Sequence, residues 1–207
     1  MTIDTVIFDF GGVLYKTPNM RNLLKWQKIL GVANDPEVTK LIYDPASSEL
    51  FRDVMVGIVK EEELWNLLAK QWHIPPRLYT RIQRNLMSRR RINKPLERIL
   101  KSLKGKYRTA ILSNAGDQTR NTMENVFGFH KLVDKIIISA EEGMAKPNKE
   151  LFEITLNRLD SQAEKCVFID DLLENIEAAK AIGMKTIHHT DNDLTILALS
   201  KHLEMGM

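Results

Sequence analysis

The chain has almost no cysteine, because Cys166 is the only one among its 207 residues. A single thiol excludes an internal disulfide framework, and scarce cysteine is typical of proteins from reducing compartments. Cys166 begins the apolar run Cys166-Val-Phe-Ile169, so we expect it to be a buried core residue.

The chain also lacks a long hydrophobic run and a strong net charge. No apolar stretch approaches the ~20 residues that span a bilayer. No basic segment at the amino terminus leads into an apolar stretch, as a secretory signal requires. The formal net charge of +3 is too small to indicate nucleic-acid or membrane binding by itself. We therefore expect a cytoplasmic protein with no membrane partner.

One local basic cluster comprises Arg81, Arg84, Arg89, Arg90 and Arg91. A nucleic-acid patch would interleave such a cluster with aromatic residues inside a recognisable binding module, and neither is present here. The cluster is more typical of a solvated helix face. We expect no nucleic-acid partner.

The chain does contain a distinctive opening. Val6, Ile7 and Phe8 form an apolar run without alternation, which is typical of a parallel strand buried on both faces. Asp9 follows at once, where open α/β sheets place their ligands. Gly11 and Gly12 then allow a sharp turn whose amides can approach an anion. Taken alone, Asp9 could equally cap a turn.

Four later segments resemble this first strand, and helical patterns alternate with them. The predicted strands are Tyr107–Ser113, Lys135–Ser139, Cys166–Asp170 and Lys185–His188. The predicted helices are Pro95–Lys104 with Asn93 as N-cap, Lys149–Leu159, and Leu173–Ile182 stopping at Gly183. This alternation predicts a Rossmann-like α/β fold with a doubly wound parallel sheet.

A helical module interrupts the sheet. Between residues 17 and 91 the sequence shows no convincing strand. It predicts helices at Met20–Leu30, Pro36–Tyr43, Ser48–Val56, Glu61–Trp72 and Arg77–Met87. We therefore expect a core domain of residues 1–16 and 92–207 and an all-helical cap of residues 17–91. Aromatic candidates for a substrate-facing surface are Tyr15, Trp26, Tyr43, Trp65 and Trp72, although cap-core packing is the commoner role of such residues.

Polar side chains follow four of the predicted strands. They are Asp9, Ser113-Asn114, Lys146 in a short loop, and Asp170-Asp171 with Asn175 one helical turn later. Each has an ordinary structural alternative as a cap, turn or surface residue. Because the carboxyl ends of parallel strands share one edge, these groups can converge. A carboxylate nucleophile, a hydroxyl donor, a cation and acidic metal ligands suit phosphoryl transfer with Mg²⁺.

With these four motifs, the chain resembles the haloacid dehalogenase (HAD) superfamily over essentially its whole length. The segments Arg91-Ile-Asn-Lys-Pro95 and Met144-Ala-Lys-Pro147 are similar to those of the phosphatase domain of soluble epoxide hydrolases and of bacterial sugar-phosphate phosphatases. The resemblance implies a Mg²⁺-dependent phosphatase acting on a small phosphorylated metabolite, with a sugar phosphate favoured. A monomer or homodimer is expected.

The resemblance also implies roles for single residues. Asp9 would attack phosphorus and form an aspartyl-phosphate. Ser113, the Asn114 amide and Lys146 would hold the phosphate, with Gly12 contributing to its binding. The metal ligands would be Asp9, the Gly11 carbonyl and Asp171, with Asp170 as a further ligand or a support. Asn175 would support these carboxylates.

One position departs from the superfamily pattern. Most of its phosphatases carry a second Asp two residues after the nucleophile as general acid, where this chain has Gly11. Leaving groups that are stable as anions, such as those of anomeric, acyl or aryl phosphates, suffer least from that loss. A cap residue or water could substitute, and His73 is one candidate beside its ordinary role as a surface histidine.

Two other functions remain open at this point. A 2-haloacid dehalogenase would use Asp9 to attack carbon without a metal. Dehalogenases of the superfamily usually carry Tyr where this chain has Gly11, and Ser-Ser-Asn near the position of Asp170-Asp171. A catalytically weak phosphate-binding protein of the same fold is the second alternative, favoured by Gly11 alone.

Overall fold

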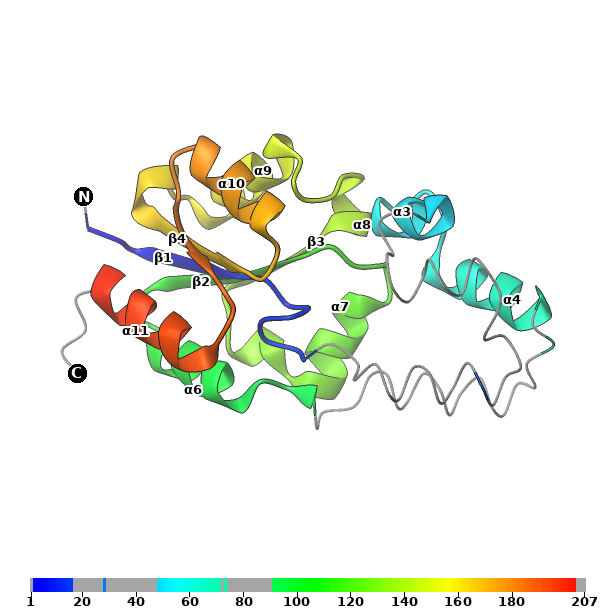
Figure 1. The fold of residues 1–207 in the computed structure, drawn as a ribbon, viewed down its shortest axis with the longest axis horizontal. Coiled ribbons are helices and arrows are strands. Elements are labelled where there is room, and N and C mark those ends of the chain that lie inside the picture. The colour runs from blue at the N-terminus through cyan, green and yellow to red at the C-terminus, as the bar shows by residue number, and fades with distance from the viewer. Residues whose placement is uncertain (1, 17–27, 29–47, 72, 74–90, 204–207) are drawn as a thin grey trace.

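One sheet of five parallel strands forms the centre of the molecule (Figure 1). The structure is a computed structural model, and it describes residues 2–16, 28, 48–71, 73 and 91–203. The strand order is β3-β2-β1-β4-β5, and every pairing is parallel. The strands are β1 Thr5–Phe8, β2 Arg108–Ser113, β3 Lys135–Ile138, β4 Cys166–Asp170 and β5 Lys185–His188. The predicted doubly wound sheet is therefore confirmed.

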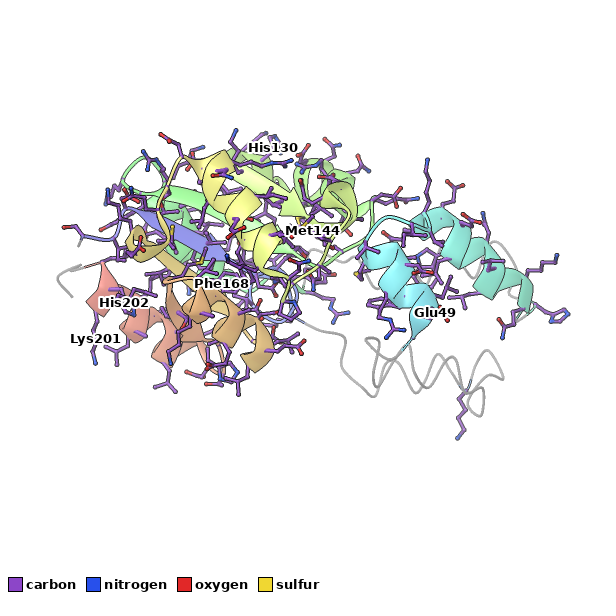
Figure 2. All side chains as sticks on the ribbon, turned by 90° about the horizontal axis from the view of Figure 1, so that it is seen from above. Glu49, His130, Met144, Phe168, Lys201 and His202 are labelled. Carbon is purple, nitrogen blue, oxygen red and sulfur yellow. The ribbon has the colours of Figure 1, made fainter. Side chains whose placement is uncertain are left out.

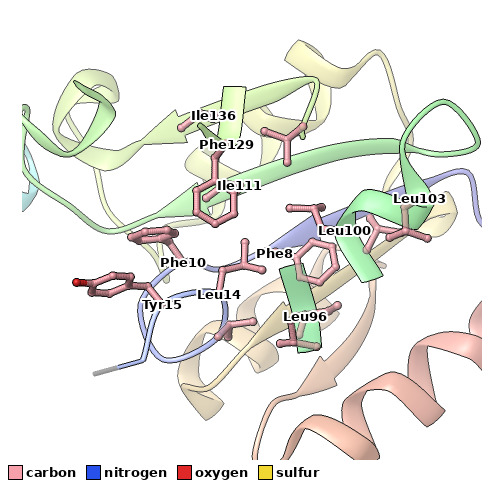
Figure 3. Packing of buried hydrophobic residues seen from close by; sticks show 14 of the residues in the cluster. Phe8, Phe10, Leu14, Tyr15, Leu96, Leu100, Leu103, Ile111, Phe129 and Ile136 are labelled. Atoms are coloured by element: carbon pink, nitrogen blue, oxygen red, sulfur yellow. The ribbon is translucent and has the colours of Figure 1, made fainter. Parts of the chain in front are cut away.

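Helices cover both faces of this sheet (Figure 1). On one face lie α9 (Lys149–Leu159) and α10 (Leu173–Ala181), and on the other lie α6 (Lys94–Leu103) and α11 (Asn192–His202). Because side chains alternate along a strand, β1 contributes to two cores. Phe8 packs with α6 in the core drawn in Figure 3, and Ile7 packs on the α9 side. Cys166 is fully buried, as predicted.

The long helices agree with the sequence prediction, with one difference in their caps. The bounds of α6, α9 and α10 lie within one residue of those predicted. Asn93 occupies the N-cap position of α6, but its side chain does not cap that helix. Its amide instead donates to the Val13 carbonyl and to Asn192 Oδ1, both at 2.8 Å. Asn93 thus ties the turn after β1 to the start of α11.

Several short elements and one longer helix were not predicted. The connection between β2 and β3 holds a helical turn α7 (Thr119–Asn121), a π-helix η3 (Thr122–Phe127) and a 3₁₀ turn η4 (Phe129–Lys131). Further short elements are α8 (Ser139–Glu142) and η5 (Ala163–Lys165). The longer helix is α11, in which Leu194 and Leu197 are exposed, so the helix lacks a continuous apolar stripe. A detectable signal was Asp191, whose carboxylate caps α11.

Two described helices lie beside the sheet rather than against its faces (Figures 1 and 2). They are α3 (Glu49–Met55) and α4 (Glu61–Gln71), and both agree with the prediction. Val54, Leu64 and Leu68 form a small apolar cluster between them. The other three helices predicted for the cap lie outside the described residues, apart from residue 28.

The α3–α4 pair meets the sheet domain at α8 and at the loop after β2. Gly57 has a φ of +74°, and a Cβ there would stand 2.2 Å from the carbonyl oxygen of Ala140. The Glu61 N–H donates to Asp117 Oδ1 at 3.0 Å. Gly57 is therefore a position where backbone conformation and close approach both require glycine.

The structure describes two of the five aromatic residues that the sequence suggested for a substrate-facing surface. Tyr15 does not face a substrate surface, because it packs in the main core with its ring 5.2 Å from that of Phe10 and 5.4 Å from that of Phe127. Trp65 lies partly buried against the α3–α4 cluster. Trp26, Tyr43 and Trp72 lie outside the described residues. No helix in the described ranges has the length and hydropathy needed to cross a membrane.

Candidate functional site

The polar residues that follow the strands converge at one edge of the sheet. The register sets Phe8 of β1 beside Ile111 of β2 and Ile169 of β4. Asp9, one residue further along, therefore lies between the ends of its two neighbouring strands. Ser113 ends β2 and Asp170 ends β4, and all three side chains are buried. Sequence reasoning alone had placed these groups at this edge.

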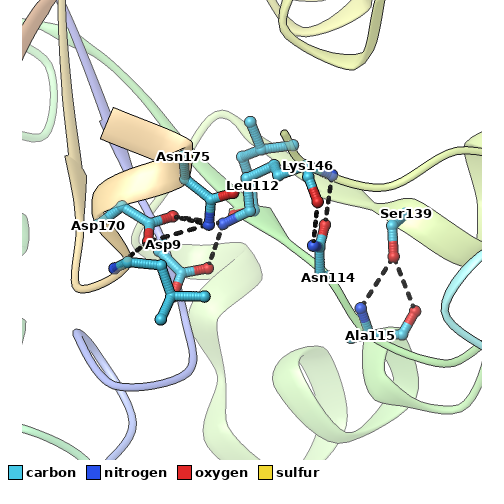
Figure 4. Close-up of polar contacts among 9 residues, drawn as sticks. Asp9, Leu112, Asn114, Ala115, Ser139, Lys146, Asp170 and Asn175 are labelled. Carbon is cyan, nitrogen blue, oxygen red and sulfur yellow. Dashed lines mark hydrogen bonds and ion pairs between the residues drawn. The ribbon is translucent and has the colours of Figure 1, made fainter. Parts of the chain in front are cut away.

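A buried ammonium group joins two of the carboxylates. Lys146 Nζ lies 2.6 Å from Asp9 Oδ1 and 2.7 Å from Asp170 Oδ2, and it also donates to the Leu112 carbonyl at 3.0 Å (Figure 4). The three oxygens accept all three of its protons. With 2% of its side chain exposed, Lys146 is a rigid positive charge held against Asp9.

Negative charge exceeds positive charge at this site. Burial is the main cause that raises the pKa of Asp9 to about 7, with Lys146 opposing the rise and Asp170 adding to it. Burial and the neighbouring Asp170 also raise the pKa of Asp171. Three carboxyl groups thus share the charge of Lys146. A second cation would relieve this excess and return Asp9 to its ionised form.

The donor set fits Mg²⁺. Asp9, Asp170 and Asp171 each offer an oxygen, and these atoms lie within 4.8 Å of one another. Mg²⁺ prefers carboxylate oxygen and keeps several waters. Within the described part of the chain, the buried oxygen Asn175 Oδ1 has no hydrogen-bond partner. A metal-bound water is the kind of donor that would satisfy this oxygen.

Asp170 and Asp171 are not equivalent in this cluster. Asp170 accepts from Lys146 at 2.7 Å, from the Leu172 N–H at 2.8 Å and from Asn175 Nδ2 at 3.1 Å on both oxygens (Figure 4). A carboxylate has about four acceptor positions, so these contacts fill them. Asp171 is only half-buried, and His188 Nε2 lies 3.0 Å from its carbonyl oxygen. The geometry favours Asp171 as the metal ligand and Asp170 as its support.

Gly12 leaves the room that the Asp171 carboxylate occupies. Its φ is +82°, and a Cβ at this position would stand 2.0 Å from Asp171 Oδ2. Gly11 differs, because a Cβ there would meet no atom within 4 Å. Gly11 could therefore accept a side chain, whereas Gly12 could not.

We expect Gly12→Ala to weaken Mg²⁺ binding by on the order of 10–100-fold, as loss of a ligand's correct position does. The added methyl collides with the Asp171 carboxylate and occupies a left-handed backbone conformation. Isothermal titration with Mg²⁺ measures the effect. Gly11→Ala adds the same methyl into open space and is the matched control, which should bind Mg²⁺ far more tightly than Gly12→Ala. Equal affinities would contradict the placement of Asp171.

Asn114 positions Lys146 through its side chain. Its Oδ1 accepts from the Lys146 N–H and its Nδ2 donates to the Lys146 carbonyl, both at 2.8 Å. The side chain is therefore committed to the main chain of Lys146, and any phosphate contact of Asn114 falls to its backbone amide. Asn175 Nδ2 donates to both carboxylate oxygens of Asp170 at 3.1 Å, and Asn175 is 2% exposed.

Sequence reasoning missed two supporting residues. Ser139 is fully buried at the end of β3, and its hydroxyl accepts from the Ala115 N–H at 2.9 Å and donates to the Ala115 carbonyl at 3.3 Å (Figure 4). It thereby fixes the loop after Ser113. His188, at the end of β5, holds the Asp171 main chain. The available signal for both was a polar residue at a strand end.

Comparison with known proteins places this chain in a family. The haloacid dehalogenase-like hydrolase profile matches residues 3–183. The sesquiterpene phosphatase astK of Aspergillus oryzae is 28% identical over 200 residues, which cover 96% of this chain and 95% of that protein. The bifunctional epoxide hydrolase 2 of Mus musculus is 30% identical over 115 residues, which cover 52% of this chain and 21% of that protein.

Solved structures share the fold. A HAD-like family hydrolase from Porphyromonas gingivalis has a TM-score of 0.78 at 24% identity, over 100% of both chains. A HAD family enzyme from Bacteroides thetaiotaomicron, in complex with magnesium and inorganic phosphate, has a TM-score of 0.72 at 22% identity, over 89% of this chain and 93% of its own. The matched profile includes Asp9, Ser113, Lys146 and Asp170-Asp171. This chain therefore belongs to the haloacid dehalogenase-like hydrolases.

Proposed function

We propose that the protein is a Mg²⁺-dependent phosphatase that hydrolyses a small phosphorylated metabolite through an aspartyl-phosphate on Asp9. The observation that carries this proposal is that the Asp9 carboxylate lies 2.6 Å from the Lys146 ammonium. Asp9 also belongs to a cluster of three carboxylates whose oxygens could hold a metal ion. A phosphoryl dianion repels a carboxylate nucleophile, and a buried ammonium beside a divalent ion offsets that repulsion. The sesquiterpene phosphatase relative supports the same reaction class.

The proposed roles follow from where each group lies. Asp9 Oδ attacks phosphorus, and Lys146 holds that carboxylate and places its positive charge beside the transferred phosphoryl group. The Ser113 hydroxyl and the Asn114 amide bind the phosphate. The Gly12 N–H, predicted from the sequence to contribute, donates instead to the Tyr15 carbonyl at 2.8 Å, so Gly12 shapes the turn. Asp9, the Gly11 carbonyl and Asp171 would hold Mg²⁺, with Asp170 and Asn175 orienting them. When bound, Mg²⁺ supplies charge neutralisation at the phosphoryl oxygens.

The substrate is proposed at a coarser level. Gly11 provides no acid for the leaving oxygen, and the resemblance to sugar-phosphate phosphatases favours a sugar phosphate. One relative acts on sesquiterpenes according to its name, so an apolar phosphate ester belongs in any substrate panel. We also propose that residues 17–91 form a cap over the core domain of residues 1–16 and 92–207, and that the protein is cytoplasmic.

We expect purified protein with Mg²⁺ to release phosphate from members of a panel of phosphorylated metabolites that includes sugar, acyl, aryl and isoprenoid esters. A chelator should abolish release, because the carboxylate cluster then repels the substrate. Colorimetric phosphate detection provides the measurement. No release from any ester contradicts the phosphatase proposal. Chloride release from chloroacetate in the presence of chelator would favour the dehalogenase alternative instead.

A further inference from the structure

The amino-terminal end of α4 receives its cap from another part of the chain. The first N–H groups of a helix have no acceptor inside that helix. Lys60 precedes α4, and a lysine side chain carries donors but no acceptor. Asp117, in the loop after β2, supplies the acceptor instead, because its Oδ1 accepts from the Glu61 N–H at 3.0 Å. A carboxylate of the sheet domain therefore caps a helix of the α3–α4 pair.

Gly116 is the residue on which both helices of the pair pack. A Cβ at this position would stand 2.7 Å from Glu61 Oε2 and 3.0 Å from Val54 Cγ1. Val54 belongs to α3 and is 1% exposed, and Gly116 is buried as well. The helix pair thus fills the space that a side chain of Gly116 would need, so its contact with the loop is close-packed.

This contact lies next to the groups proposed to bind phosphate. Residues 113–117 are consecutive, and Ser113 and Asn114 are the proposed phosphate ligands among them. Ala115 is held by the Ser139 hydroxyl, which bonds both its N–H and its carbonyl. Ala140 follows Ser139, and its carbonyl oxygen is the atom that Gly57 of the helix pair approaches. The pair therefore packs on the end of the phosphate loop and on the segment that supports it.

The end of α4 that makes these contacts is its amino-terminal end. From Glu61 to Gln71 the helix is about 16 Å long at 1.5 Å per residue, and Figure 1 shows its other end pointing away from the sheet. His73, which the sequence suggested as a substitute acid, follows that other end and is exposed. Trp65 lies one helical turn after Glu61, and its Nε1 donates to Glu61 Oε1 at 3.4 Å. Trp65 is therefore close to the contact with the loop, and His73 is not.

We propose that Asp117 is a positioning residue for phosphate binding. By capping α4 it holds the α3–α4 pair against the loop that carries Ser113 and Asn114, and the packed pair stiffens that loop. This inference rests on the proposed function, in which these two residues bind the phosphate. Linkage between two equilibria is reciprocal, so bound phosphate favours the packed position of the pair, and loss of the cap weakens phosphate binding.

The first test compares wild type, Asp117→Ala and Asp117→Asn. Asparagine caps helices as well as aspartate does and keeps the accepting oxygen, so Asp117→Asn is the matched control. We expect Asp117→Ala to raise the Kd of inorganic phosphate by about fivefold, the factor that corresponds to the ~1 kcal/mol a lost cap typically costs. Isothermal titration with saturating Mg²⁺ measures this Kd. Asp117→Asn should bind phosphate as wild type does.

The affinity for Mg²⁺ alone separates positioning of the loop from general damage to the fold. It should be the same in all three proteins, because the carboxylate cluster comes from the ends of β1 and β4. Equal phosphate affinities in wild type and Asp117→Ala, or a parallel loss of Mg²⁺ affinity, would overturn the inference and leave the phosphatase proposal intact. A wild type that binds no phosphate and hydrolyses no ester of the panel would overturn both.

Gly57→Ala disturbs the same contact from the side of the helix pair and leaves the phosphate loop unchanged. Its Cβ would stand 2.2 Å from the Ala140 carbonyl oxygen, a backbone atom that cannot rotate away. We expect phosphate affinity to fall at least as far as in Asp117→Ala. Adding Asp117→Ala to Gly57→Ala should cause little further loss, because both act through the packed pair. Fully additive losses would show that Asp117 acts by another route, and the inference would fail.

The fluorescence of Trp65 provides a direct readout of the contact. Trp26→Phe and Trp72→Phe leave Trp65 as the single tryptophan of the chain. In this background we expect Asp117→Ala to shift the emission to longer wavelength than Asp117→Asn does, since a released pair exposes the indole. Saturating Mg²⁺ and inorganic phosphate should shift it back. An emission that stays constant while calorimetry shows bound phosphate would contradict the coupling.

Discussion

Replacing Asp9 by asparagine is expected to lower phosphate release by on the order of 10³-fold or more. The neutral amide is nearly isosteric with the carboxylate but is a poor nucleophile toward phosphorus, and it removes one oxygen ligand from the proposed Mg²⁺ site. Steady-state phosphate release with saturating Mg²⁺ measures the loss. Asp160→Asn is a suitable control, because Asp160 is an exposed residue with a φ of +47° that asparagine also tolerates.

The same variant should not be less stable than the wild type. Burial raises the pKa of Asp9 in the folded protein from 3.8 to about 7, so the folded state binds a proton more tightly than the unfolded state does. Without Mg²⁺, the free energy of unfolding of the wild type should therefore fall as pH rises from about 4 to 7. Asp9→Asn should lack this contribution.

Full turnover by Asp9→Asn would refute the nucleophile assignment.

Replacing Lys146 by methionine is expected to lower the free energy of unfolding by about 3–5 kcal/mol in metal-free protein near pH 8. Methionine keeps most of the side-chain volume, but Asp9 and Asp170 then lose the ammonium that lies 2.6 and 2.7 Å from them. Phosphate release should be lost as well. Denaturant unfolding monitored by circular dichroism gives the stability change.

The stability loss should shrink when the surplus negative charge is removed. Lowering the pH protonates the carboxyl groups, and added Mg²⁺ stabilises the folded state in proportion to its binding. Lys149→Met is the matched control, since Lys149 is 69% exposed and pairs with Glu153 across one helical turn. A surface pair of this kind contributes little to stability. Equal losses in the two variants would show that the buried contacts do not stabilise the fold.

Much of the fold follows from local pattern. The apolar runs at Val6–Phe8 and Cys166–Ile169 have the composition of strands buried on both faces, and the helix of Lys149–Leu159 has a continuous apolar stripe. The sequence did not predict α11 or the helical turns between β2 and β3. The stripe of α11 is interrupted by exposed leucines, and a π-helix has no comparable sequence period.

The kinds of side chain at the site could likewise be predicted from their positions in the sequence. Asp9, Ser113, Lys146 and Asp170 each follow a predicted strand, and parallel strands deliver their ends to a common edge. The different roles of Asp170 and Asp171 could not be predicted from the sequence. It depends on which carboxylate receives Lys146 and Asn175 from distant elements.

Local sequence thus specified the strands, the helices that pack on them and the kinds of side chain at their ends, because alternation and periodicity depend on near neighbours. Long-range packing specified what those side chains do. Asn114 holds the main chain of Lys146 from 32 residues away, and Asp117 meets the N–H of Glu61 across 56 residues. Contacts between segments so far apart arise when the chain closes on itself, and no short window of residues encodes them.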